Sequence, residues 1–234
     1  MPDLLESWPG ADRRRPSRGT QGWSVREPLA RWLEAEGRSV GGLRVLDVGC
    51  GVKPYFPFFA SAREYVGVDL VQTGYADLVG PIEQLPVEDA SFDVVLCIQV
   101  LEHVDDPVRA IRELHRVTRP GGRVLLSTHG TQGYHPVPND HWRWTHTGLE
   151  RLFNTSSPWR SVSVVPGAGT CACLGMLLTT YVDLAAQRAH AVWVGRMVCH
   201  AVNRVAGAID ARAASLREPR PGSLFANYHV VAER

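Results

Sequence analysis

Short apolar runs alternate with helical stretches over the first 130 residues of the chain. The clearest runs are Leu43–Val48, Tyr65–Asp69, Ser91–Ile98 and Arg123–Thr128. Each is almost continuously apolar, which is typical of parallel strands covered on both faces. Strands that alternate with helices predict an α/β fold, here a doubly wound, Rossmann-like, mostly parallel seven-stranded sheet. The carboxyl ends of its strands would meet at one edge, where ligands bind.

The remaining elements follow from the same periodicities and from capping signals. Ser24 is a candidate N-cap for a helix through Glu36, with Glu27 as its capping-box partner. The further expected elements are helices at 54–62, 106–117, 147–153 and 172–216 and strands at 76–79, 160–165 and 225–232, with a turn at Pro120–Gly122 and a long loop at 129–145. We expect a flexible segment at 1–22 and one domain at 23–234. A helical lid at about 170–216, inserted before the last strand, would cover the ligand edge.

Composition narrows the class of protein. The chain has 234 residues and a formal net charge of +1, so no overall field favours nucleic acid, and the basic run Arg13–Arg18 is typical of a solvated end. Five scattered cysteines indicate a reducing compartment, and the polar start and the absence of a long apolar segment predict a cytoplasmic protein with no integral membrane segment. A homodimer is compatible with the sequence.

A glycine turn and two acids carry the first chemical signal. Asp47 lies just before Gly49 and Gly51, and Asp69 ends the next strand. The glycines allow a nucleoside to approach the backbone, and an acid after the second strand can bind ribose hydroxyls. A dinucleotide site needs a third glycine where this chain has Pro54, and Asp47 would repel a pyrophosphate. The pattern therefore favours S-adenosylmethionine, which is cationic and has no phosphate.

Several motifs together make the chain resemble the class I S-adenosylmethionine-dependent methyltransferases of the small-molecule branch. They are VLDVGCG at 45–51, GVDL at 67–70, Leu85-Pro86 with Ser91-Phe92-Asp93, VLEHV at 100–104, and Arg116-Val117 before Pro120-Gly121-Gly122. The segments Tyr134–Pro136 and Asp140–Thr145 resemble a subgroup associated with bacterial glycan and secondary-metabolite modification.

The resemblance implies roles for individual residues. Asp47, Gly49 and Gly51 would line the methionine moiety, Asp69 would bind the ribose, and Leu70 would pack on the adenine. Gln99 would lie near the methionine end of the cofactor. Relatives usually have an acid where this chain has Pro81, so Ile82 and Glu83 would replace its contact with the adenine amine.

Histidines in the long loop are the candidates for acid–base chemistry. Methyl transfer to a hydroxyl is helped by a base of near-neutral pKa, and His135 and His141 are slightly favoured over His129 for this role. The same residues, with Asp140 and His146, match no metal-ligand spacing, so no metal is expected. His103 is equally a structural histidine or a wall of the site. The Trp142–Trp144 pair either stacks on an acceptor or pins the loop to the fold.

These observations predict a methyltransferase that acts on an oxygen of a small-molecule or glycan-type acceptor. Three alternatives stay open: a carbon methyltransferase on a quinone or polyketide, a nicotinamide-dependent oxidoreductase, and a non-catalytic cofactor-binding subunit. His190, Trp193 and Met197 are expected to share one face of a late helix and to pack there.

Overall fold

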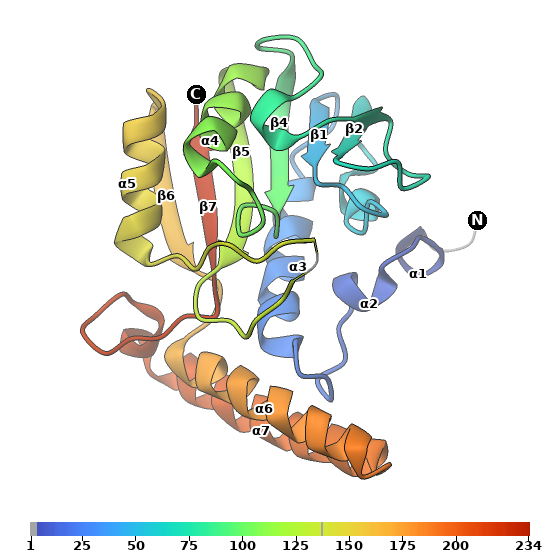
Figure 1. Cartoon of the computed structure of the whole chain (residues 1–234), viewed down its shortest axis with the longest axis vertical. Helices are drawn as coiled ribbons and strands as arrows, with labels where there is room; N and C mark the ends of the chain where they lie inside the picture. Colours follow the sequence, from blue (N-terminus) through green and yellow to red (C-terminus); the bar gives the residue numbers. More distant parts are fainter. Residues whose placement is uncertain (1–3, 137) are drawn as a thin grey trace.

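The chain folds around one seven-stranded sheet (Figure 1). The structure is a computed structural model that describes residues 4–136 and 138–234. The strands lie in the order β3-β2-β1-β4-β5-β7-β6. Only β7 is reversed, since it pairs antiparallel with both β5 and β6. The predicted α/β fold with a mostly parallel sheet is confirmed. The strands are β1 Arg44–Val48, β2 Glu64–Asp69, β3 Leu78–Val79, β4 Phe92–Ile98, β5 Thr118–His129, β6 Ser161–Pro166 and β7 Asn227–Glu233.

Consecutive strand residues feed two separate cores, one on each face of the sheet. Leu46 and Leu126 belong to one core cluster, whereas their neighbours Val45 and Leu125 belong to the other. Side chains alternate between the faces of a strand, so an uninterrupted apolar run fills both cores. This is the physical reason that the apolar runs could be recognised as strands.

Helices cover both faces, and a long hairpin follows β6. The α-helices are α1 Leu4–Ser7, α2 Ala11–Arg14, α3 Trp23–Gly37, α4 Pro107–Val117, α5 His146–Ser156, α6 Thr170–Arg188 and α7 Val192–Arg212. Short 3-10 helices are η1 Phe56–Phe59, η2 Ile82–Gln84 and η3 Ala214–Arg217. The α6–α7 hairpin extends below the edge at which the β4 arrow ends (Figure 1).

The N-terminal half differs from the sequence prediction at α3. The helix begins at Trp23 after Gly22, which makes no side-chain cap. Ser24 lies inside the helix with its hydroxyl buried and without a hydrogen bond, and Glu27 pairs with Arg31 one turn on. The predicted capping box is therefore wrong.

The structure also differs from the sequence prediction in the segments before and after β1. The expected helix at 54–62 is only the 3-10 turn η1, since Pro54 and Pro57 remove the amide hydrogens that a regular first helical turn would use. The expected irregular start contains α1 and α2 instead. Arg14 is buried there and donates to the carbonyl oxygens of Leu5, Trp8, Pro9 and Pro54, so it is not part of a solvated basic run.

The later elements follow the prediction more closely. Asp106 caps α4 by accepting a hydrogen bond from the Arg109 amide at 3.0 Å, with Pro107 at the first helical position. The expected turn at Pro120–Gly122 is part of β5, which begins at Thr118. No helix in the described ranges is long and apolar enough to cross a membrane.

Candidate active site

The turn after β1 opens a space beside its backbone. Gly49 and Gly51 have φ angles of 70° and 53°, which other residues adopt at a cost. A Cβ added to Gly49 would lie 2.3 Å from Val100 Cγ2, so this residue packs the turn against the segment after β4. A Cβ added to Gly51 would meet nothing within 4 Å. The Gly51 position therefore faces open space at the carboxyl edge of the sheet.

Asp69 links the ends of the first two strands. Its Oδ2 accepts a hydrogen bond of 2.8 Å from the Gly51 amide, and its Oδ1 is 3.4 Å from the Val71 amide. The Thr73 hydroxyl donates to the Gly51 carbonyl at 2.7 Å, so both peptide groups that flank Gly51 are held. Because Oδ1 has only this long contact, it is the atom of Asp69 best placed to accept from a ligand.

Asp47 is a second acid at the same edge, but it is buried. Its Oδ2 accepts a hydrogen bond of 2.7 Å from the Tyr65 hydroxyl, and burial raises the pKa of Asp47 to about 7. Lys53 opposes this rise, although its Nζ is held 2.5 Å from Asp77 Oδ2. Asp47 is thus poised to ionise when a cation arrives.

We expect Asp47→Asn to change how stability depends on pH. The pKa of the folded state lies above the ordinary value of 3.8, so the stability that protonated Asp47 contributes is present at low pH and is lost as pH rises towards about 7. The unfolding free energy of the variant relative to wild type should therefore increase over that interval, by up to about 4 kcal/mol. Urea titrations of ligand-free protein at a series of pH values measure this difference; a constant difference would contradict it.

The other predicted cofactor residues take different positions around this edge. Leu70 is exposed directly after Asp69, whereas Ile82 is buried in the core. The Glu83 carboxylate accepts from the amides of Asp105 and Asp106 and so braces the segment after β4. Gln99 has a φ of 57°, and its side-chain amide donates to the Ser127 hydroxyl at 2.9 Å. All four remain proposals as ligand contacts.

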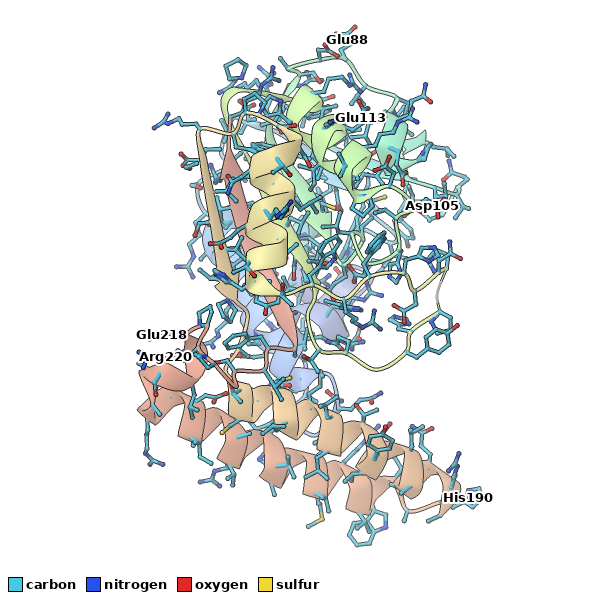
Figure 2. All side chains as sticks on the ribbon, turned by 60° about the vertical axis from the view of Figure 1, so that its left-hand side comes forward. Glu88, Asp105, Glu113, His190, Glu218 and Arg220 are labelled. Atoms are coloured by element: carbon cyan, nitrogen blue, oxygen red, sulfur yellow. The ribbon has the colours of Figure 1, made fainter. Side chains whose placement is uncertain are left out.

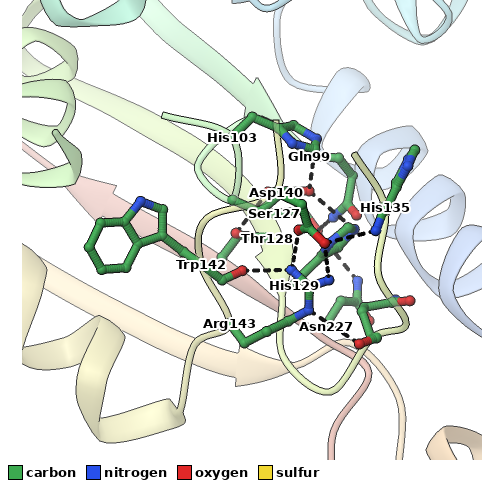
Figure 3. Close-up of polar contacts among 12 residues, drawn as sticks. Gln99, His103, Ser127, Thr128, His129, His135, Asp140, Trp142, Arg143 and Asn227 are labelled. Carbon is green, nitrogen blue, oxygen red and sulfur yellow. Dashed lines mark hydrogen bonds and ion pairs between the residues drawn. The ribbon is translucent and has the colours of Figure 1, made fainter. Parts of the chain in front are cut away.

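Three histidines gather at the carboxyl ends of β4 and β5 (Figure 3). The ring centroids of His129 and His135 are 6.2 Å apart and nearly parallel, and that of His103 is 6.3 Å from the first and 5.8 Å from the second. Two of the three predicted base candidates are thereby brought together. The third, His141, is exposed, with Nε2 3.4 Å from Asp105 Oδ1.

A buried acid lies beneath this histidine cluster. Glu102 is fully buried, accepts from the Thr128 hydroxyl at 2.9 Å, and places Oε1 3.1 Å from His129 Nε2. Burial raises the pKa of Glu102 to about 7 and lowers that of His129 to about 3. His129 is therefore neutral at physiological pH and a weak proton acceptor.

An ion pair holds the loop that carries His135. Arg143 contacts Asp140 through both terminal nitrogens, at 2.5 and 2.8 Å, and also donates to the carbonyl oxygens of Gln132 and Gly133. Asp140 Oδ2 accepts from the His135 amide at 2.7 Å, and the adjacent guanidinium keeps the pKa of Asp140 well below its ordinary value. The Asp140–Arg143 pair thus positions His135 over His129.

The remaining loop residues are structural in their contacts. Trp142 stacks on Trp144 and donates to the Val104 carbonyl at 2.8 Å, so the pair is tied to the segment after β4. His146, the first residue of α5, places its Nε2 2.9 Å from the Val164 carbonyl oxygen. Within the described residues no group of three or more histidine, cysteine, aspartate or glutamate side chains could hold a metal ion.

Sequence reasoning missed Glu102 and the Asp140–Arg143 pair as parts of the site. Glu102 follows a buried strand, and a carboxylate there needs polar partners, which was a usable signal. The ion pair has the i, i+3 spacing of a helical contact but lies in a loop, where spacing does not predict contact.

Comparisons with known proteins agree with this architecture. Residues 46–126 match the family model described as a methyltransferase domain. The chain is 36% identical over 113 residues to the ubiquinone biosynthesis O-methyltransferase of Bordetella bronchiseptica, covering 42% of this chain and 47% of the relative. The enzyme of the same name from Pseudomonas aeruginosa is 35% identical over 115 residues, covering 42% and 48%. The matched region thus spans about half the length of these curated relatives.

Two solved structures resemble the whole fold. The [4+2]-cyclase SpnF superimposes with a TM-score of 0.56 at 18% identity, over 89% of this chain and 81% of its own. Phosphoethanolamine N-methyltransferase 2 of Haemonchus contortus, in complex with S-adenosylhomocysteine and phosphomonomethylethanolamine, gives 0.56 at 14% identity over 88% and 52%. At such identities the likeness establishes the fold alone, and one of the two proteins is a cyclase, so the chemistry must be argued from the site.

Proposed function

Because this chain carries a class I methyltransferase domain, we propose that it transfers a methyl group from S-adenosylmethionine to an oxygen of a small-molecule or glycan-type acceptor. The observation that carries the proposal is the pair of acids near the carboxyl ends of β1 and β2, one of which accepts from the Gly51 amide beside open space. The curated relatives, whose name includes O-methyltransferase, support oxygen as the methylated atom.

The residues present fit the cofactor better than a dinucleotide. Asp69 Oδ1 is available to accept from a ribose hydroxyl, and the space at Gly51 admits a nucleoside against the backbone. Buried Asp47 would gain a cationic partner, whereas a pyrophosphate would face two acids there. When bound, the cofactor supplies an activated methyl group, and this chain's residues align the acceptor and exclude water.

We assign proton removal from the acceptor to His135. Its ring is on the solvent side of the histidine cluster, while the lowered pKa values of His129 and His103 make both weak acceptors. His129 is fixed between Glu102 and the His135 ring, so it orients the histidine above it. His141, which is exposed beside Asp105 and is not in the histidine cluster, is given no role in the transfer.

Calorimetry with the folded protein tests the proposal. S-adenosylmethionine and S-adenosylhomocysteine should bind and NAD should not. Between about pH 5.5 and 7 the affinity for S-adenosylmethionine should rise with pH, by up to about tenfold per unit, because the ligand favours the ionised form of Asp47. Binding should release a proton, which two buffers of different ionisation enthalpy reveal. In Asp47→Asn the affinity should be lower and independent of pH over this range.

Failure to bind S-adenosylmethionine would refute the proposal, and binding of NAD in its place would support the oxidoreductase alternative. If binding occurs, incubation with methyl-labelled cofactor and a panel of phenols and sugars identifies the acceptor. Mass spectrometry then distinguishes a methyl on oxygen from one on carbon.

A further inference from the structure

The α6–α7 hairpin exposes an unusual number of apolar side chains. It holds more than half of the large exposed hydrophobic residues in the described chain: Leu174, Leu178, Tyr181, Leu184, Val192, Trp193, Val194, Met197, Val198, Val205 and Ile209. The tip of the hairpin, marked by His190, projects away from the sheet (Figure 2). The expected packing of Trp193 and Met197 is wrong, since these side chains are 69% and 64% exposed.

These residues follow the helical repeat. Leu174, Leu178 and Tyr181 are spaced i, i+4, i+7 along α6, and Val194, Val198 and Val205 are spaced i, i+4, i+11 along α7. Each set therefore forms a stripe along its own helix. We call the two stripes together the outer face.

The two stripes point to the same side of the hairpin. The two helices pack against each other at their glycines. Gly175 of α6 lies against Ala206 of α7, and Gly195 of α7 lies against Ala186 of α6, so closely that an added Cβ would touch the alanine. The sides turned to the rest of the protein carry buried residues such as Met176 on α6 and Asn203 on α7. Relative to these contacts, both stripes lie on the side opposite the body.

Specific polar contacts hold the hairpin in this orientation. Asp210 of α7 accepts from the amides of Cys171 and Ala172 at the start of α6, at 3.1 and 2.9 Å. The Asn203 side chain donates to the carbonyl oxygens of Arg18 and Thr20, at 2.9 and 3.0 Å. These contacts fix the hairpin so that the outer face is exposed to the surroundings.

The charges around the outer face are mostly positive. The hairpin contains four arginines, at 188, 196, 204 and 212, against two aspartates, of which Asp210 is buried. No carboxylate of the described residues forms an ion pair with any of the four. Arg196 and Arg204 line a groove of about 590 Å³ whose other walls include Ser17 and Gly19 of the N-terminal segment and Val205 of the outer face, so the groove borders both.

We propose that the outer face binds the surface of an anionic phospholipid bilayer. Apolar side chains of the outer face would enter the headgroup boundary, with Tyr181 at the depth that aromatic residues prefer, while the arginines contact lipid phosphates. A second copy of the chain fits less well, because a twofold axis through this face would bring the arginines of both copies together. This inference does not depend on the proposed reaction.

Vesicle flotation of the full chain tests this proposal. At about 0.1 M salt the protein should float with vesicles of mixed phosphatidylcholine and phosphatidylglycerol, and binding to phosphatidylcholine alone should be at least about tenfold weaker. The triple variant Leu178→Ser, Tyr181→Ser, Val198→Ser should weaken binding roughly 100-fold, and so should Arg188→Gln, Arg196→Gln, Arg204→Gln. All six positions are exposed, so circular dichroism and cofactor binding should be unchanged.

Matched controls use exposed residues on the other helices. Val108→Ser on α4 and Arg151→Gln on α5 should leave flotation unaltered. Absence of binding to the anionic vesicles, or binding that both triple variants retain, would overturn the proposal. A solution dimer that dissociates in the apolar triple variant, without vesicle binding, would overturn it in favour of a second copy.

Discussion

Gly51→Ala should strongly weaken cofactor binding while leaving the protein folded. A Cβ at this position meets nothing within 4 Å, so the added methyl group would occupy the space that we assign to the cofactor. The positive φ of 53° adds a conformational cost of about 1 kcal/mol, which a stable fold tolerates. We expect the calorimetric affinity for S-adenosylmethionine to fall by at least about 100-fold, equivalent to about 2.7 kcal/mol.

Gly42→Ala is the matched control for this experiment. Gly42 also has a positive φ, of 76°, and a Cβ there would also meet nothing within 4 Å. The two variants should therefore lose similar stability in urea, but only Gly51→Ala should lose the cofactor. Equal affinities in the two variants would show that the cofactor binds elsewhere.

The strands and the cofactor loop could be predicted because their signals are local. An apolar run buried on both faces, or a glycine turn followed by an acid, is specified within a few residues. The β4 run Phe92–Ile98 and the turn at Gly49–Gly51 are examples, and both are where the sequence placed them.

The sequence predictions that were wrong concern residues whose contacts with distant segments override their local preferences. Ser24 has the right chemistry for an N-cap, but the N-cap of the observed helix is Gly22, two residues earlier, and Ser24 is buried within the helix. Arg14 belongs to a basic run that normally stays solvated, yet backbone carbonyl oxygens from three segments surround it. The pattern of apolar and polar residues along the sequence signals neither the burial of Ser24 nor that of Arg14.

The histidine cluster is a second case in which contacts between distant segments could not be predicted from the sequence. The sequence placed His129, His135 and His141 in one loop and favoured His135 and His141 only slightly, because a firmer ranking depends on which rings meet. Glu102, from the segment after β4, and Asp140, from the loop itself, decide this by holding His129 and the His135 backbone. Contacts between separate segments therefore select the candidates that spacing alone proposes.

His135→Ala should slow methyl transfer far more than it weakens cofactor binding. A positioned base contributes roughly 10²- to 10⁴-fold to such a reaction, so we expect kcat to fall by at least about 100-fold with the affinity for S-adenosylmethionine unchanged. His141→Ala removes an exposed histidine from the same loop and should retain nearly full activity. The measurement is single-turnover transfer from labelled cofactor to the acceptor found in the screen. The reverse ranking of the two variants would reassign the base to His141.

Asp140→Asn separates the base from the group that positions it. The amide removes the charge that pairs with Arg143 but keeps an oxygen that can accept from the His135 amide, so the loop should loosen without losing the histidine. We expect an intermediate loss of kcat, roughly tenfold, because a misplaced base still accepts a proton. In His135→Ala the same substitution should have no additional effect, since there is then no base to position. Additive losses in the double variant would mean that Asp140 acts independently of His135, and would remove the loop clamp from the proposed mechanism.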